Sequence, residues 1–202
     1  MPFTLVTLAT ILVFTWLLEP RGVPVELPAA VVLGVTIWSA WRSGQWGLSR
    51  RALVPASRAA ALFTVPAVLV ILATGMALGT LHDRGSLAEN LGGLVLWGGA
   101  QQFVLQTVVL REAQQLTSSR KSIVIAAFLF ALVHLPNPIL TLMTFIGALG
   151  WCTIFTRYPN LVPLAGSHAV ATLALLYAFD DRLTGRLRIG AAFLRLTASG
   201  LH

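Results

Sequence analysis

Residues 121–137 read K-S-I-V-I-A-A-F-L-F-A-L-V-H-L-P-N, and residues 138–156 continue with P-I-L-T-L-M-T-F-I-G-A-L-G-W-C-T-I-F-T. Each stretch is almost wholly apolar and close to the length of a membrane-spanning helix, which needs about 20 such residues. Pro136 and Pro138 separate the two stretches, because neither proline donates a backbone hydrogen bond and each restricts the residue before it. The sequence therefore predicts two membrane helices joined by a sharp turn.

Five more apolar runs extend this pattern, at about residues 2–18, 23–41, 59–80, 88–110 and 161–179. Of the 202 residues, 56% are hydrophobic and 10% are charged, and the mean hydropathy is +0.81. A soluble globular domain has about 25% charged residues, so the composition excludes that class. The sequence predicts an all-α fold, a polytopic transmembrane helix bundle of about seven spans plus interfacial helices. We expect a single integral membrane domain over residues 1–202.

The basic residues lie in short gaps between the apolar runs, and the net charge is +7. This distribution is typical of membrane orientation by positively charged cytoplasmic loops. Nucleic-acid binding would need a soluble basic face, so no nucleic-acid partner is expected. Residues 42–58 hold four arginines, with Trp38, Trp41 and Trp46 nearby, and predict a cytoplasmic segment at the lipid headgroups. Alternation of the spans places residues 111–121 and Arg157 on the same side.

The C-terminal tail leaves two interpretations open. Its arginines would be external after a seventh span, against the positive-inside tendency; they are Arg182, Arg186, Arg188 and Arg195. Either one apolar run is miscounted, or residues 184–197 form an amphipathic interfacial helix.

The first apolar run and the single cysteine bear on how the chain is processed. The N-terminal M-P-F-T-L-V has no basic segment before its apolar run, and we expect a retained first span, not a removed signal peptide. Cys152 can form no disulfide within the chain, and its apolar surroundings favour a small buried side chain. The predicted localisation is multi-pass, in a bacterial or archaeal cytoplasmic membrane, with membrane lipid as a partner.

Polar residues inside three of the apolar runs are the candidates for function. They are Gln101, Gln102 and Gln106 in Q-Q-F-V-L-Q, His134 with Phe130 in F-A-L-V-H, and His168 with Thr172 in H-A-V-A-T. Polar groups in hydrocarbon are costly and usually face a bundle interior, so three such helices predict one convergent site. The alternative is that the glutamines serve helix packing, since hydrogen bonds between membrane helices contribute about 0.6–2 kcal/mol each.

The order and spacing of these residues resemble the CPBP family, the CAAX-prenyl-endopeptidase-like and bacteriocin-processing intramembrane proteases. That family reads E-E-x-x-x-R on one helix, F-x-x-x-H on the next, and H-x-x-x-N (or Asp) further on. The resemblance covers a CPBP-like core at about residues 90–180. It implies an intramembrane endopeptidase in which a glutamate activates water, the histidines assist, and the Asn stabilises an oxyanion.

Four positions depart from the family pattern. Gln101 and Gln102 stand at the glutamates, Gln106 at the arginine and Thr172 at the Asn or Asp. A glutamine amide has an acceptor and two donors but no useful basicity, so it cannot replace a carboxylate as base. The predicted site comprises His134, His168, Gln101 and Gln102 at the catalytic positions, and Gln106, Phe130 and Thr172 as substrate-binding residues.

The leading functional prediction is a CAAX-protease-like membrane protein with an altered site. It would bind hydrophobic or lipidated peptide segments with weak or no hydrolysis. A second hypothesis is an active intramembrane endopeptidase with a histidine base, since imidazole titrates near neutral pH. A third is a lipid- or isoprenoid-handling enzyme or transporter.

Other groups near the candidate site carry weaker predictions. No metal and no other cofactor is expected, because a zinc site needs three or four protein ligands and the histidines supply two. Glu112 is expected to form an interfacial ion pair with Arg111. Ser167 is expected to be a small interface residue, because adjacent helical side chains point about 100° apart and it cannot form a nucleophile–base pair with His168.

Overall fold

The structure is a computed structural model that describes residues 1–83, 85 and 87–198, with the backbone alone for residues 87–90. These described residues contain no strand, and the predicted all-α class is confirmed. In chain order the elements are α1 (Pro2–Val13), η1 (Phe14–Leu18), η2 (Glu19–Arg21), α2 (Glu26–Ser43), η3 (Arg50–Ala52), α3 (Leu53–Leu78), α4 (Leu87–Val104), η4 (Leu105–Leu110), α5 (Arg111–Leu116), α6 (Ser119–Leu132), α7 (Pro138–Arg157), α8 (Leu161–Ala178), α9 (Asp181–Thr184), η5 (Gly185–Leu187) and α10 (Gly190–Ala198).

Several helix boundaries differ from the predicted runs, and two of them lengthen a helix. α3 begins at Leu53, inside the segment expected to be interfacial, because Pro55 falls in the first turn, where its missing N–H is not needed. The fourth run continues past its predicted end through η4 and α5 to Leu116. Arg111 and Glu112 thus extend this helix instead of ending it.

In the part of the chain that the structure describes, five helical stretches are long and apolar enough to cross a membrane. They are Pro2–Arg21, Arg50–Leu78, Leu91–Leu116, Pro138–Arg157 and Leu161–Ala178. The two other predicted spans correspond to α2 and α6, which are not among these five. α6 has 14 residues, or ~21 Å at 1.5 Å per residue, which is shorter than the hydrocarbon core. The molecule is a polytopic membrane bundle, and the count of seven spans stays a prediction.

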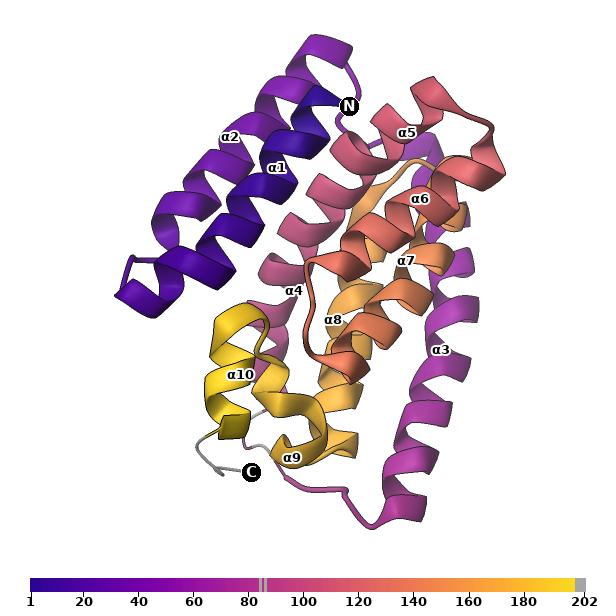
Figure 1. Cartoon of the computed structure of the whole chain (residues 1–202). Helices are drawn as coiled ribbons and strands as arrows, with labels where there is room; N and C mark the ends of the chain where they lie inside the picture. The colour runs from indigo at the N-terminus through magenta and orange to yellow at the C-terminus, as the bar shows by residue number, and fades with distance from the viewer. Residues whose placement is uncertain (84, 86, 199–202) are drawn as a thin grey trace.

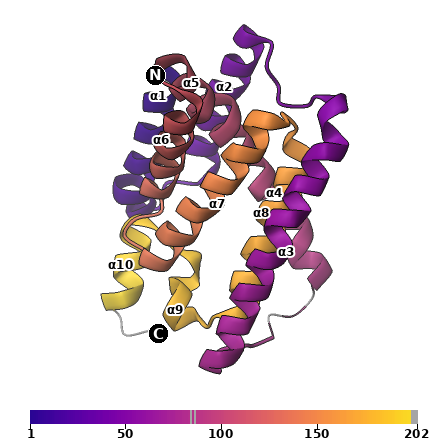
Figure 2. The same cartoon turned by 90° about the vertical axis from the view of Figure 1, so that its right-hand side faces the viewer.

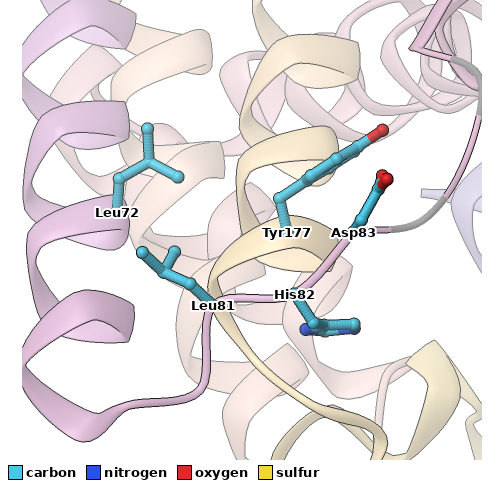
Figure 3. Close-up of a pocket in the computed structure, with 5 residues that line it drawn as sticks. All are labelled: Leu72, Leu81, His82, Asp83 and Tyr177. Atoms are coloured by element: carbon cyan, nitrogen blue, oxygen red, sulfur yellow. The ribbon is translucent and has the colours of Figure 1, made fainter.

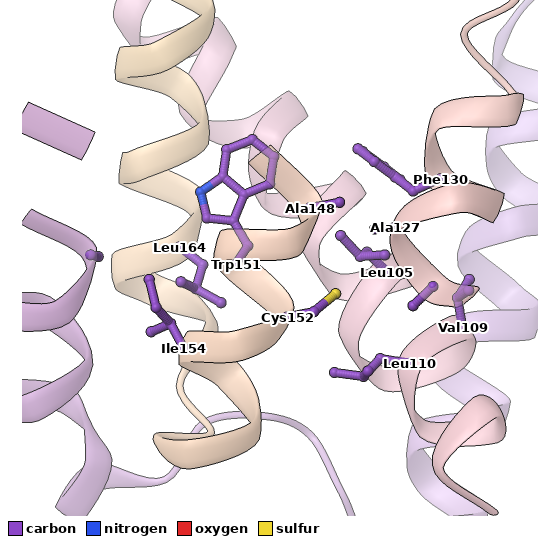
Figure 4. Close-up of a cluster of buried hydrophobic side chains, with 12 residues drawn as sticks. Leu105, Val109, Leu110, Ala127, Phe130, Ala148, Trp151, Cys152, Ile154 and Leu164 are labelled. Carbon is purple, nitrogen blue, oxygen red and sulfur yellow. The ribbon is translucent and has the colours of Figure 1, made fainter. Parts of the chain in front are cut away.

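The α1–α2 hairpin lies along one side of the bundle and α3 along the opposite side, with α4, α6, α7 and α8 between them (Figure 1; Figure 2 gives the view at 90°). Side chains of η4, α6, α7 and α8 fill the core (Figure 4), among them the fully buried Leu105, Cys152 and Leu164. α4 packs directly against α8 at Gly98, where a Cβ would lie 3.3 Å from Cβ of His168. This close approach places the glutamines of α4 beside His168.

One end of the bundle, which we call the basic end, contains the connections α2–α3, α5–α6 and α7–α8 (Figure 1). Hydrogen bonds from Ser49 N to Pro159 O (3.2 Å) and from Asn160 Nδ2 to Ser49 O (2.9 Å) join two of these connections. The end holds eight basic residues and one acid: Arg42, Arg50, Arg51, Arg58, Arg111, Glu112, Arg120, Lys121 and Arg157. The described opposite end is balanced: Arg21, Arg182, Arg186, Arg188 and Arg195 with Glu19, Glu26, Asp83, Asp180 and Asp181. The asymmetry supports the predicted cytoplasmic placement of the basic end.

The tail folds as α9, η5 and α10 at the end opposite to the basic end (Figure 1). Its anchor is Asn137 in the turn after His134: Asn137 Nδ2 donates to Thr184 O (2.8 Å) and Arg188 O (3.1 Å). Arg188 also forms an ion pair with Glu19 at 3.7 Å. The predicted interfacial segment 184–197 is therefore helical over α10 and packed against the bundle.

Candidate functional site

Gln102 and Gln106 face the same way on the α4–η4 helix because they are four residues apart. Gln106 Nε2 donates to Gln102 Oε1 at 2.9 Å, and Gln102 Nε2 lies 3.2 Å from Nδ1 of His168 on α8. All three side chains are buried, at 6% exposure or less. They form one continuous hydrogen-bonded chain across the α4–α8 contact.

With the glutamine amides oriented as in the structure, the hydrogen-bond network gives the two histidines opposite neutral tautomers. Gln102 Oε1 is engaged by Gln106, so its amide nitrogen donates to His168 Nδ1, and the ring proton of His168 is on Nε2. His134 Nδ1 lies 2.7 Å from the carbonyl oxygen of Phe130, which only accepts. His134 therefore carries its proton on Nδ1 and has its lone pair on Nε2.

Aromatic rings connect the two histidines. The ring centroid of Phe130 lies 5.0 Å from that of His134 and 6.3 Å from that of His168, with edge-on geometry in both cases. Trp151 of α7 stacks on His168, with centroids 4.5 Å apart and planes 16° apart. Phe130 thus stands between the imidazoles, and all three rings belong to one buried cluster with the Gln102–Gln106 pair.

Ser167 has more polar contacts than a small interface residue needs. Trp151 Nε1 donates to Ser167 Oγ at 2.8 Å, and Ser167 Oγ lies 2.5 Å from Thr64 Oγ1 on α3. Thr64 donates its own hydroxyl to Ala60 O at 2.7 Å, so the proton between the two hydroxyls belongs to Ser167. This relay ties α3, α7 and α8 together beside the stacked ring of His168.

Gln101 and Thr172 are placed less closely than the other predicted site residues. Both are half-buried, and neither forms a hydrogen bond with another described residue. Thr172 lies one turn beyond His168 on α8, and Gln101 precedes the first member of the glutamine pair. The structure therefore joins Gln102, Gln106 and His168 by hydrogen bonds and His134 and Phe130 by ring contacts, and leaves Gln101 and Thr172 at the edge.

The predicted ion pair between Glu112 and Arg111 is wrong. Glu112 is buried at 4% exposure, and its carboxylate accepts the backbone N–H of Phe3 (3.2 Å) and of Thr4 (2.9 Å) in the first turn of α1. Arg111 turns instead to α2 and donates to Ser39 O at 3.0 Å. The helix N-terminus offers free N–H groups and a partial positive charge, and these bind the carboxylate better than the neighbouring guanidinium on the same turn can.

The described hydrogen-bond partners of both histidine rings are an amide and a carbonyl, not a carboxylate. Among the described side chains, no group of three or more His, Cys, Asp and Glu is placed to hold a metal ion. The side chain of Glu89, an acid near the start of α4, lies outside the described residues.

Among the cavities lined by described residues, there is one at each end of the bundle. The cavity at the basic end has a volume of about 740 Å³ and reaches Gln106; it is lined by Gly44, Gln45, Trp46, Gly47, Leu48, Ser49, Gln106, Thr107, Gln114, Phe155, Thr156 and Pro159. The other, of about 450 Å³, is lined by Leu72, Leu81, His82, Asp83 and Tyr177 (Figure 3). Tyr177 is nine residues beyond His168, ~13 Å along α8. Of these two cavities, the first includes a residue of the glutamine–histidine chain and the second does not.

Sequence reasoning missed Trp151, Ser167 and Thr64 as neighbours of His168. Trp151 offered one signal: it lies inside its apolar run, away from the ends where interfacial aromatic rings gather, so its indole N–H needed a buried acceptor. No signal in the sequence pointed to the cavity at the basic end, because residues 44–49 and Thr156 are brought to Gln106 only by the packing of α7 and α8.

The fold and these contacts define a class: an α-helical membrane protein with a buried amide–imidazole site at the contact of its central helices. A model of the family described as Type II CAAX prenyl endopeptidase Rce1-like matches residues 84–174, which include Gln102, Gln106, His134 and His168. Over these residues, 91 of the 202, the chain is similar to this CAAX-protease-like (CPBP) family. Comparisons with curated proteins and with solved structures gave no match.

Proposed function

We propose that the buried site binds an apolar or lipidated peptide segment and hydrolyses it weakly or not at all. The observation that carries this proposal is the hydrogen-bonding of Gln102. Its oxygen accepts from Gln106 and its nitrogen donates to His168, at a position where the family pattern has a glutamate. An amide in this arrangement accepts no proton from water, so the step that generates the nucleophile lacks its base.

The surroundings support binding rather than chemistry. Phe130, Trp151 and the histidines form a mainly aromatic buried cluster, which suits contact with an apolar chain. The amide groups give the site polar atoms that fix the orientation of a ligand, in the usual proportion for binding pockets. Membrane lipid and a hydrophobic or lipidated peptide segment are the proposed partners.

The tautomer of His134 favours a second candidate, hydrolysis with a histidine base. With its proton on Nδ1 held by Phe130 O, His134 keeps the Nε2 lone pair for a water molecule. General-base catalysis by such a group contributes about 10²–10⁴-fold. This candidate requires no carboxylate and makes the opposite prediction for turnover.

The decisive experiment is a cleavage assay with the full chain in liposomes and an apolar or prenylated test peptide. We expect no turnover by the wild-type protein, together with binding of the peptide that weakens in His134→Ala and His168→Ala. Turnover that is lost in both variants would reject the first proposal in favour of the histidine base. Gln101→Glu with Gln102→Glu tests whether carboxylates restore activity, and Thr74→Ala, an exposed α3 position bonded only to Val70 O, is the matched control.

A further inference from the structure

The cavity at the basic end differs in charge from the surface around it. None of its twelve lining residues is charged, although Arg42, Arg50, Arg51 and Arg157 all flank the lining segments in sequence. The lining groups are amides, hydroxyls, backbone and the apolar side chains of Trp46, Leu48, Phe155 and Pro159. At about 740 Å³ the volume is within the range of ligand pockets, ~300–1,000 Å³. The cavity is therefore a neutral, mixed polar and apolar chamber at the basic end of the bundle.

The wall of this chamber formed by residues 44–49 is fixed. Leu161 N donates to Gly47 O at 2.8 Å, and Ser49 is bonded to Pro159 and Asn160. Trp46 stacks on Phe103 with centroids 6.4 Å apart. Gly47 has φ +67°, and a Cβ there would lie 2.9 Å from Leu161 Cγ, so only glycine fits. The chamber is thus a built feature and not a gap under a loose loop.

Gln106, one of the residues that line the chamber, has an unpaired polar atom. Gln106 is 1% exposed, and its Oε1 has no hydrogen-bond partner, while Nε2 is used by Gln102. Exchanging oxygen and nitrogen in both glutamine amides keeps the Gln106–Gln102–His168 chain but leaves Nε2 of Gln106 unpaired instead. Either way one neutral group of Gln106 remains for a ligand, and such a buried group costs free energy until it is paired.

We propose that this chamber binds an uncharged, hydrogen-bonding stretch of peptide chain, with a peptide or side-chain amide paired to Gln106, and rejects a free carboxylate. The inference rests on the proposed function, that the site binds peptide, and adds which chemical form of peptide it takes. A carboxylate in the chamber would lose its water and find no cation among the lining residues, which is costly. An amide loses less hydration free energy on entering the chamber, and it supplies a hydrogen-bond partner for the unpaired group of Gln106.

The test uses two dye-labelled apolar peptides of one sequence, one ending in a carboxamide and the other in a free carboxylate. Binding to the full chain is measured in nanodiscs of neutral lipid at about 0.15 M salt. At this ionic strength the attraction of a charged peptide to the arginines of the basic end is screened beyond ~8 Å. We expect the carboxamide to bind at least about tenfold more tightly. Gln106→Arg places a cation in the chamber and should reverse this preference.

A second variant protects the test against misfolding of Gln106→Arg. Gln114 is an exposed lining residue on α5, bonded to Thr156 at 3.2 Å and not part of the glutamine–histidine chain. Gln114→Arg should raise affinity for the carboxylate peptide, and Thr74→Ala should leave both affinities unchanged. Equal binding of the two peptides to the wild type, or a preference for the carboxylate, would overturn the inference and leave the proposed function intact. Failure of both peptides to bind would contradict the proposed function itself.

Discussion

Two buried polar clusters lie on one continuous helical line, α4–η4–α5, and they differ in charge. The inner cluster is neutral and consists of Gln102 and Gln106 bonded to His168. The outer cluster is acidic: Glu112, ten residues further on and ~15 Å along the axis, accepts two N–H groups of α1. Both are at least nine-tenths buried, so burial alone does not decide which polar group the chain uses.

The difference is in the donors that surround each group. At Glu112 the first turn of α1 presents backbone N–H groups that no helical carbonyl can satisfy, together with the positive end of the helix dipole. At Gln102 the neighbours are another amide and an imidazole, which give the site no fixed positive charge. A carboxylate is stable where hydrogen-bond donors are already assembled around it. An amide is the polar group that the inner site can satisfy without a fixed positive charge.

The largest expected effect comes from breaking the outer cluster. Glu112→Ala leaves the N–H groups of Phe3 and Thr4 without their charged acceptor and should lower the stability of the folded protein by about 3 kcal/mol. Thermal unfolding in detergent, followed by circular dichroism, measures it. Gln115→Ala changes an exposed residue three positions along α5 and should be neutral. Equal unfolding temperatures for the two variants would show that the α1 contact carries no stability.

A smaller effect is expected in the inner cluster. Gln102→Leu removes the acceptor of Gln106 and the donor to His168, and hydrogen bonds between membrane helices contribute about 0.6–1.7 kcal/mol each, so a loss of about 2 kcal/mol is expected. ¹⁵N NMR of the His168 ring gives a second measurement. In the variant, the tautomer in which Nδ1 accepts a hydrogen bond should no longer be favoured. A loss as large as that of Glu112→Ala would mean that charge does not distinguish the two clusters.

The same contrast shows how far sequence reasoning reaches. Gln102, Gln106 and His168 could be predicted to meet because each is costly in hydrocarbon and their spacing matches a family pattern. Glu112 could not be placed, because its partners are backbone N–H groups more than a hundred residues away in sequence. The chemistry of a side chain can be read from the sequence, whereas a free helix N-terminus becomes a hydrogen-bond partner only when packing brings it near.

The helix boundaries follow the same division. Apolar runs predicted α7 and α8 to within one residue at each end, since Pro138 and Asn160 mark their starts and polar residues follow them. The end of α6 at Leu132 was not predicted, because the prolines placed the turn at residues 136–138, whereas in the structure the turn already covers residues 133–136.

The smallest expected effect tests how far the inner cluster extends beyond its amides. Ser167→Ala removes the acceptor of Trp151 Nε1 and the partner of Thr64, at the back of the ring that stacks on His168. Because Thr64 keeps its bond to Ala60 O, only the indole loses its partner, and the expected loss is about 1 kcal/mol. Ser57→Ala, which removes a hydroxyl bonded to its own helix at Leu53 O, is the control. Near-ultraviolet circular dichroism of Trp151 in the folded protein reports the local change. An unchanged tryptophan signal and an unchanged unfolding temperature would confine the inner cluster to Gln102, Gln106 and His168, because the hydroxyl relay would then contribute nothing to the position of the indole.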